Sequence, residues 1–161
     1  MSHPLRDRAC IVGIGETPVC RKPGSGRSET ALQLEAALLA IEDAGLKPSQ
    51  IDGIMPFPNL GKAEVFASNL GCDNLRFAAL LTLGGAAPVA ALRAAAMAVA
   101  TGVAEHVLVP AGWNGFSGAR VRETAASDPD SIPGAAIARD FYLPFGLTAT
   151  PQWYALMARR H

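Results

Sequence analysis

The stretch that decides the fold is LLTLGGAAPVAALRAAAMAVATG, residues 80–102. It begins as an apolar, strand-like run, turns at Gly84 and Gly85, and then takes on the composition of a helix. Pro88 suits the first turn of that helix and Gly102 suits its end. Many α/β enzymes present a reactive group at a strand–turn–helix junction of this kind. This turn carries no nucleophile, acid or base, so it offers the geometry of an active-site turn without the usual chemistry.

The helix expected after the turn is rich in alanine. Nine of the fifteen residues from Ala86 to Ala100 are alanine, and Arg93 is the one charged residue among them. A helix at a protein surface carries a polar face, so we expect this helix to be buried on most sides. The chain has strands enough for one sheet, and a second covering layer must come from elsewhere. We therefore expect no stable isolated monomer, but a homodimer or a pairing with a C-terminal half that this chain lacks.

Strands and helices alternate in the sequence around this stretch. A short apolar run ends at Gly13 and Gly15 and is typical of a first strand. This alternation predicts an α/β fold with a mostly parallel, covered sheet. The expected strands are residues 9–14, 50–57, 75–83 and 105–112, and the other expected helices are residues 28–44 and 62–70, the latter closed by Gly71.

The first helix has clear start and stop signals. Ser28 is a good N-cap residue, and Gly45 is a natural residue just past the end of a helix. The polar positions of the helix leave a wide apolar face that we expect to be buried. The polar positions are Gln33, Glu35, Glu42 and Asp43, and the apolar face is Leu32, Leu38, Leu39 and Ile41.

The pattern changes after Gly112. Residues 117–134 are polar with turn dipeptides, which predicts a loop. Residues 138–148 are apolar and irregular, and a final helix is expected over residues 151–161. Because that helix receives no stop signal, the ending resembles a cut through a larger protein. We divide the chain into an N-terminal α/β half, 1–112, and the start of a loop region, 113–161, which we expect to be truncated.

Composition bounds the class of protein. The chain has 161 residues, 50% of them hydrophobic, and a formal net charge of zero, so no basic excess points to nucleic acid. Three widely spaced cysteines argue against a secreted disulfide scaffold, and we expect a cytoplasmic protein. Cys10 is expected to be a small buried side chain and Cys20 a loop thiol. The apolar run over residues 77–92 is broken by glycines and a proline, so no membrane span is expected.

Several familiar sites are not predicted by the sequence. Gly13 and Gly15 have the spacing of a dinucleotide-binding turn, but Pro18 takes the third glycine position, and turn residues are the better interpretation. No pair among the three histidines has metal-ligand spacing, so no metal site is expected.

A candidate binding segment follows the fourth strand. Trp113, Asn114 and Phe116 lie just past its carboxyl end, where ligands bind in parallel α/β sheets. An aromatic side chain and an amide there suit an apolar ligand with a polar handle. A packed loop with a hydrogen-bonded Asn114 explains the same residues equally well.

The whole chain resembles the N-terminal part of the thiolase superfamily, in its lipid-transfer-protein or sterol-carrier branch. The central segment is the most specific. The resemblance implies a layered α/β fold in which Gly85 stands at the position of the nucleophilic cysteine. The segments that carry it are CIVGIGETP (10–18), ALLAIEDAGLKPSQIDGI (37–54), LGGAAPVAALRAAAMAVATGVAEHVLVPAG (83–112) and PFGLTATPQWYALMARRH (144–161).

The resemblance also implies a function. A glycine cannot form an acyl-enzyme, so thiolytic acyl transfer is not expected. Some thiolase-like lipid-transfer proteins without the cysteine are aldolases that cleave acyl-CoA thioesters with steroid-like chains. They act with an OB-fold partner and keep their acid–base residues in the C-terminal half. By this resemblance we expect a carbon–carbon lyase of retro-aldol type with an acyl-CoA or lipid thioester as substrate and no cofactor.

The candidate substrate-binding residues are Gly84, Gly85, Trp113, Asn114 and Phe116, and this chain alone is expected to be inactive. Three alternatives stay open: a non-catalytic module for acyl-CoA or lipid binding or for assembly, a relative of conventional acyl-CoA acyltransferases, and, ranked lower, a cofactor-binding α/β protein.

Overall fold

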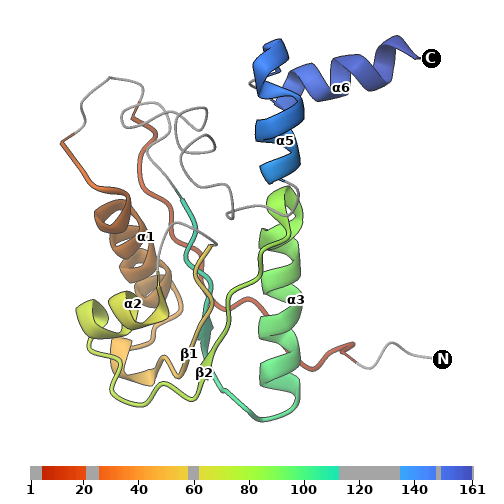
Figure 1. The fold of residues 1–161 in the computed structure, drawn as a ribbon. Helices are drawn as coiled ribbons and strands as arrows, with labels where there is room; N and C mark the ends of the chain where they lie inside the picture. The colour runs from red at the N-terminus through yellow and green to blue at the C-terminus, as the bar shows by residue number, and fades with distance from the viewer. Residues whose placement is uncertain (1–4, 21–25, 58–61, 113–134, 148–149, 161) are drawn as a thin grey trace. The chain divides into compact units, whose positions relative to one another are not determined.

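A computed structural model describes residues 5–20, 26–57, 62–112, 135–147 and 150–160 (Figure 1). The chain divides into two compact units, Met1–Ser117 and Gly118–His161. The first unit contains a parallel sheet with helices, and the second contains helices only in its described part. Each unit is described below by itself.

In its described residues, the first unit has a sheet of three short strands. They are β1 (Gly53–Ile54), β2 (Phe77–Ala78) and β3 (Val107–Leu108), in the order β2-β1-β3 with both pairs parallel. Gly53 lies opposite Phe77 on one side and Val107 on the other. The predicted parallel sheet is therefore confirmed, with strands shorter than the apolar runs that predicted them.

Residues 9–14, the first predicted strand, are extended but pair with no strand in the described part of the chain. Their side chains are exposed, except for Gly13. Cys10 is exposed with them, so the prediction that it is buried was wrong. The reason is that its burial depended on the segment joining the sheet.

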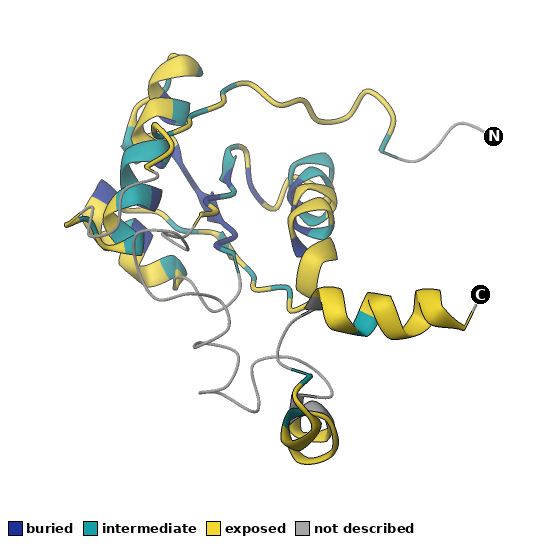
Figure 2. Cartoon of the chain, turned by 90° about the horizontal axis from the view of Figure 1, so that it is seen from above, coloured by how far each residue is buried: buried dark blue, intermediate teal, exposed yellow. Residues whose placement is uncertain are grey.

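Helices cover both faces of the sheet (Figure 1). Successive residues of a strand point to opposite faces, and Ile54 and Met55 divide accordingly. Ile54 belongs to one core cluster with residues of α1 (Glu29–Asp43) and α2 (Ala63–Leu70), and Met55 belongs to a second cluster with Ala91 and Ala95 of α3 (Ala87–Ala100). Figure 2 shows the buried residues on the strands and on the sides of the helices that face them. The arrangement is a three-layer α/β/α unit.

Helix α1 (Glu29–Asp43) begins and ends where the sequence predicted. The hydroxyl of Ser28 accepts a hydrogen bond from the Ala31 N–H at 3.1 Å. Gly45, just past the C-cap, has a φ of +67°, in the left-handed region that favours glycine.

The predicted apolar face of α1 was partly wrong. The buried residues are Gln33, Ala37 and Ile41, four residues apart, whereas Leu38 and Leu39 are exposed. The helix packs along this stripe because alanine permits close approach, and because Gln33 finds a hydrogen-bond partner described below.

Helix α2 (Ala63–Leu70) lies beside α1 and closes the first core cluster. Phe66 and Leu70 are its buried residues. It ends at Gly71, which has a φ of +72°, as the sequence predicted. A single 3-10 turn, η1 (Pro48–Gln50), leads from α1 into β1 and is held by the Gln50 side chain, which accepts a hydrogen bond from the Lys47 N–H at 2.8 Å.

Helix α3 (Ala87–Ala100) follows a 3-10 turn, η2 (Gly84–Ala86), with Pro88 in its first turn. Its buried face is a stripe of small residues. Its opposite face is apolar but exposed within this chain. The sequence predicted burial on most sides of the helix, but only one face is buried. The buried stripe is Ala87, Ala91, Ala95 and Ala98, and the large exposed side chains are Val89, Leu92 and Met97.

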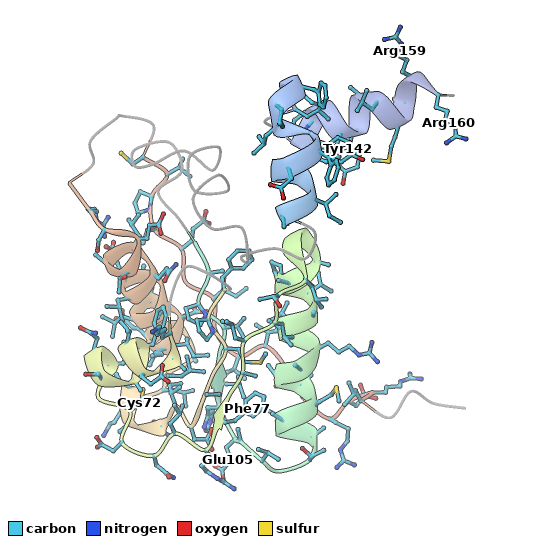
Figure 3. The ribbon with its side chains drawn as sticks, in the orientation of Figure 1. Cys72, Phe77, Glu105, Tyr142, Arg159 and Arg160 are labelled. Carbon is cyan, nitrogen blue, oxygen red and sulfur yellow. The ribbon has the colours of Figure 1, made fainter. Side chains whose placement is uncertain are left out.

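The described part of the second unit contains helix α5 (Ala135–Phe141), a 3-10 turn η3 (Leu143–Phe145) and helix α6 (Thr150–Arg159). The ring of Tyr142, labelled in Figure 3, packs on Trp153 with centroids 4.4 Å apart. The predicted final helix is confirmed. The prediction of an irregular segment over 138–148 was wrong where α5 covers it, because a helix of seven residues shows too little periodicity to be recognised.

Candidate functional site

The turn between β2 and α3 is held by a few local contacts. The Ala86 N–H donates to the Leu83 carbonyl at 3.2 Å, and this closes the 3-10 turn. Gly84 has a φ of +55°, in the left-handed region, so its backbone requires glycine. Gly85 is different, because a Cβ atom added there would meet nothing within 4 Å. Glycine at position 85 therefore leaves an open space and is not required by packing.

The turn presents the amino-terminal end of a 14-residue helix. In the described part of the chain, the N–H groups of Gly84 and Gly85 have no hydrogen-bond acceptor. Such groups, together with the helix dipole, favour partial negative charge nearby. No ionisable side chain occurs in residues 80–92. The turn can therefore bind an electron-rich oxygen, but it offers no nucleophile and no acid or base.

The carboxyl ends of the strands meet at one edge of the parallel sheet. Beyond β1, the Phe57 N–H donates to the Pro110 carbonyl at 3.0 Å, so the two strands run on together past their formal ends. Gln33, which is only 2% exposed, donates from Nε2 to the Gly112 carbonyl at 2.5 Å. Its Oε1 atom is buried and has no partner in the described part of the chain. Gln33 thus ties α1 to the end of the β3 segment.

The three other candidate site residues, Trp113, Asn114 and Phe116, lie outside the described residues. Just before them, a small cavity of about 240 Å³ opens beside Gly112. Glu16 is one of its lining residues. The full lining is Gly15, Glu16, Thr17, Leu32, Ala36, Ala111 and Gly112.

Sequence reasoning missed both Glu16 and Gln33. Glu16 lies within the segment CIVGIGETP (10–18) but was given no role there, and the only signal for Gln33 was its four-residue spacing with Ala37 and Ile41.

The best-organised charged group lies at the opposite, amino-terminal edge of the sheet. Asp52 is 8% exposed and accepts hydrogen bonds from the Glu105 N–H at 2.9 and 3.0 Å and from the His106 N–H at 2.8 Å. The Arg76 guanidinium lies 3.6 Å from the same carboxylate. Asp52 therefore fixes the start of β3 against β1. Because the candidate turn follows the other ends of the strands, we assign Asp52 a structural role.

The buried thiol, Cys72, is no candidate nucleophile. Its Sγ lies 3.4 Å from the Pro48 carbonyl, to which it donates. Burial, and secondly the negative charge of Asp73, raises the pKa of the Cys72 thiol above its ordinary value. The thiolate is the reactive form of cysteine, so this environment suppresses reactivity. Cys72 is labelled in Figure 3, below α2.

The described residues offer little else to hold a cofactor. They contain no group of three His, Cys, Asp or Glu side chains placed to hold a metal ion. Within the same residues, no helix is both long and apolar enough to cross a membrane.

Solved structures of known proteins match this fold. A structure described as the Ltp2-ChsH2(DUF35) aldolase has a TM-score of 0.77 and 42% identity, covering 93% of this chain and 36% of that chain. The priming β-ketosynthase of the R1128 polyketide pathway has a TM-score of 0.51 and 23% identity, over 63% of this chain and 40% of its own.

The 3-oxoacyl-[acyl-carrier-protein] synthase III of Aquifex aeolicus VF5 has a TM-score of 0.52 and 19% identity, over 62% of this chain and 35% of its own. The two synthases share the fold alone. The chain has a thiolase-like fold, as its sequence predicted.

Curated relatives point to a narrower class of protein than the fold alone does. The chain is 41% identical over 158 residues to a steroid side-chain-cleaving aldolase of Thermomonospora curvata. It is 37% identical over 158 residues to the 17-hydroxy-3-oxo-4-pregnene-20-carboxyl-CoA lyase of Mycobacterium tuberculosis. In each case the match covers 98% of this chain but only 40% of the relative. The chain is homologous to Ltp2-type steroid side-chain aldolases over that part. No family model matches it.

Proposed function

We propose that this chain is the thiolase-like part of a carbon–carbon lyase that shortens the side chain of a steroid or lipid acyl-CoA. The observation that carries the proposal is the 41% identity to a steroid side-chain-cleaving aldolase, in a chain whose turn before α3 holds Gly85 and no nucleophile. We further propose that the backbone N–H groups of this turn bind the thioester oxygen of the substrate.

The proposed reaction is a retro-aldol cleavage. A base removes the proton of a hydroxyl group on the β carbon, and a carbonyl forms there as the bond between the α and β carbons breaks. The electron pair moves into the thioester, whose oxygen becomes an enolate, and a proton then adds to the α carbon. The products are a ketone and a shorter acyl-CoA. Two preorganised N–H donors would stabilise the enolate oxygen without forming a covalent bond.

Glycine at position 85 fits this reaction better than it fits acyl transfer. A cysteine is needed only where an acyl-enzyme forms, and a retro-aldol cleavage forms none. The open space beside Gly85 leaves room for a bulky ring system next to the thioester. The base is not assigned, because the described turn has no ionisable side chain.

We propose that the complete protein works with a DUF35-type partner. The support is the solved Ltp2-ChsH2(DUF35) aldolase, to which the chain is 42% identical. An OB-fold partner is also what the resemblance to lipid-transfer-type thiolases implies.

The test uses the complete protein together with its DUF35-type partner. It is incubated with 17-hydroxy-3-oxo-4-pregnene-20-carboxyl-CoA, and the ketone and shorter acyl-CoA are measured by chromatography and mass spectrometry. Stoichiometric formation of both products supports the lyase. Tight binding of the thioester without any cleavage would instead support the non-catalytic module.

A second experiment separates lyase from transferase chemistry. The Gly85→Cys variant of the complete assembly has space for the new side chain, so it should fold. We expect no useful thiolase activity, because the remaining acid–base groups serve another reaction. Rapid acylation of the new cysteine, seen as a mass increase of the intact protein, would contradict this expectation.

A further inference from the structure

Gln33 of α1 is a fully buried polar side chain. It is 2% exposed and lies on the buried stripe of the helix, four residues before Ala37. Burial of a side-chain amide costs free energy unless its groups find hydrogen-bond partners. An apolar side chain of the same size would fill this place without that cost. The amide of Gln33 is therefore explained by what it binds rather than by packing.

The hydrogen bond of Gln33 settles which way its amide points. Nε2 donates to the Gly112 carbonyl at 2.5 Å. A carbonyl oxygen only accepts, so a reversed amide would place two acceptor oxygens against each other. Oε1 therefore lies on the other side of the amide group, where it is buried and has no partner in the described part of the chain. One half of the amide is bound, and the other half still requires a donor.

Gly112 is the residue at which the described chain leaves the sheet, directly before the candidate binding residues Trp113 and Asn114. Its φ is +143°, in the region that favours glycine, and an added Cβ would meet only the Cγ of Gln33, at 4.0 Å. Glycine is thus required by the backbone conformation and not by a lack of space. Such a conformation persists where surrounding contacts hold it, and the Gln33 amide supplies one such contact.

The Gln33 hydrogen bond extends a regular series along one side of the β3 segment. The carbonyls of His106, Leu108 and Pro110 accept N–H groups of β1 and the residues that follow it, at 2.9 to 3.1 Å. The next carbonyl of the series belongs to Gly112, and its donor is the side chain of Gln33. Gln33 therefore takes the place of one further residue of the β1 strand and continues the ladder for one step beyond the sheet.

The ladder pattern also assigns a partner to the other half of the amide. In a parallel ladder, one residue donates its N–H to a carbonyl of the neighbouring strand, and its own C=O accepts the N–H two residues further along that strand. When a side-chain amide replaces that residue, Nε2 stands for the N–H group and Oε1 for the C=O group. The donor two residues past Gly112 is the N–H of Asn114.

We propose that Gln33 is the positioning residue of the substrate-binding segment. Its amide binds the Gly112 carbonyl with Nε2 and the Asn114 N–H with Oε1, and so sets the direction in which Trp113 and Asn114 leave the sheet. The inference rests on the proposed function only where it assigns these two residues to substrate binding. Gln33 itself touches no substrate and acts through the segment that it holds.

Hydrogen exchange of the 161-residue chain, read amide by amide by NMR, tests the hydrogen bonds without any activity. We expect the Asn114 amide to exchange about 100-fold more slowly than in an unstructured peptide. Gln33→Met keeps the size of the side chain and removes both hydrogen bonds, so it should abolish this protection. The Met55 amide, which donates to the Leu108 carbonyl within the sheet, is the reference and should stay protected in both chains. Fast exchange of Asn114 beside a protected Met55 in the wild-type chain would overturn the proposal.

Steady-state kinetics of the complete protein with its DUF35-type partner test the positioning role. Trp113 and Asn114 are proposed to bind substrate and not to react, so Gln33→Met should raise KM for the thioester about fivefold and leave kcat within about twofold. Asp52→Asn is the matched control, because it removes buried hydrogen bonds at the opposite edge of the sheet and should leave KM unchanged. An unchanged KM in Gln33→Met, or an equal rise in Asp52→Asn, would contradict the positioning role.

Gly112→Ala gives a second approach to the same peptide group. The added methyl group has space, but the positive φ opposes it, so this variant should also free the Asn114 amide and raise KM about fivefold. Because both substitutions act through one hydrogen bond, the double variant should raise KM no further than either alone, whereas independent effects would multiply. Multiplied effects would overturn the shared role. If the complete wild-type protein cleaves no thioester, the proposed function fails, and the exchange rate of the Asn114 amide still decides whether Gln33 holds this segment.

Discussion

Gly84 and Gly85 are adjacent, but glycine serves a different purpose at each position. Gly84 needs it for a left-handed backbone, and Gly85 has room for a side chain that it does not carry. The sequence predicted a turn here, and the resemblance to thiolases predicts that Gly85 stands at the position of the nucleophilic cysteine. Only the structure separates a glycine that the backbone requires from one whose presence calls for a functional explanation.

This difference predicts opposite results for two alanine substitutions. Gly84→Ala should lower the free energy of unfolding by about 1 kcal/mol because of its positive φ. Gly85→Ala should leave that free energy unchanged within roughly 0.5 kcal/mol or raise it slightly. In the proposed lyase, however, Gly85→Ala should reduce kcat/KM by about tenfold, since a methyl group enters the space proposed for substrate and tenfold corresponds to roughly 1.4 kcal/mol. Urea unfolding and steady-state kinetics measure the two effects.

Substitution of Asp52, at the opposite edge of the sheet from the candidate turn, should lower the free energy of unfolding. Asp52→Asn removes the negative charge and one of the acceptors for the Glu105 and His106 N–H groups. We expect a loss of about 1–3 kcal/mol in the free energy of unfolding, as for other buried groups that lose hydrogen bonds. The exposed Asp73→Asn is the matched control, with an expected change below about 0.5 kcal/mol. Equal effects of the two substitutions would contradict the structural role assigned to Asp52.

The environment of Cys72 leads us to expect that the free energy of unfolding depends on pH in the alkaline range. Burial raises the pKa of its thiol in the folded chain above the ordinary value of 9.0, which the unfolded chain keeps. The folded chain therefore holds the proton more tightly, and its free energy of unfolding should decrease as pH rises from 9.0. Urea unfolding at several pH values measures the slope, and Cys72→Ala should reduce it. An unchanged slope in that variant would assign the effect to other groups.

At the scale of elements, the ends of the helices were predictable from local signals, whereas the face that a helix buries was not. Ser28, Gly45 and Gly71 act on their own backbone, so the sequence was sufficient to place the helix ends. The buried face of α1 depends on what packs against it, and Gln33 is buried only because the Gly112 carbonyl accepts its hydrogen bond. The lengths of the strands likewise depend on pairing, which apolar runs do not specify.

The packing of helix α3 leads us to expect that its buried stripe tolerates only small side chains. Ala95 is 8% exposed and packs with Met55 and Ala91 beneath the sheet. Ala95→Leu should therefore overpack this layer and cost about 1–3 kcal/mol in the free energy of unfolding. Met97→Ala, on the exposed face, should cost less than roughly 0.5 kcal/mol. Urea unfolding of both variants checks the expected order.

At the scale of the whole molecule, the exposed face of α3 bears on assembly. Val89, Leu92 and Met97 are large apolar side chains of α3 that lie outside its buried stripe and are exposed. The sequence predicted that this helix needs a second cover, and among the described residues nothing covers these three side chains, so the cover stays a prediction. The turn was predictable from its glycines, whereas acid–base groups for the candidate site were not, and the described turn contains none.

The apolar face predicts association of the purified chain. Sedimentation at micromolar concentration should give a mass above that of one chain, 16.7 kDa, or a complex with a companion polypeptide. Leu92→Lys combined with Met97→Lys should shift the mass toward a monomer, because charges oppose burial of this face. A wild-type chain that sediments as a well-behaved monomer without a partner would contradict the prediction.

The order of the strands has a consequence for synthesis on the ribosome. The central strand, β1, precedes both of its neighbours in the sequence, and β2 and β3 follow it. The ribosome therefore synthesises β1 first, and β2 and β3 each emerge when the strand with which they pair has already been made. Asp52 is made about fifty residues before the Glu105 and His106 amides that it binds, so its carboxylate remains hydrated until the last strand arrives.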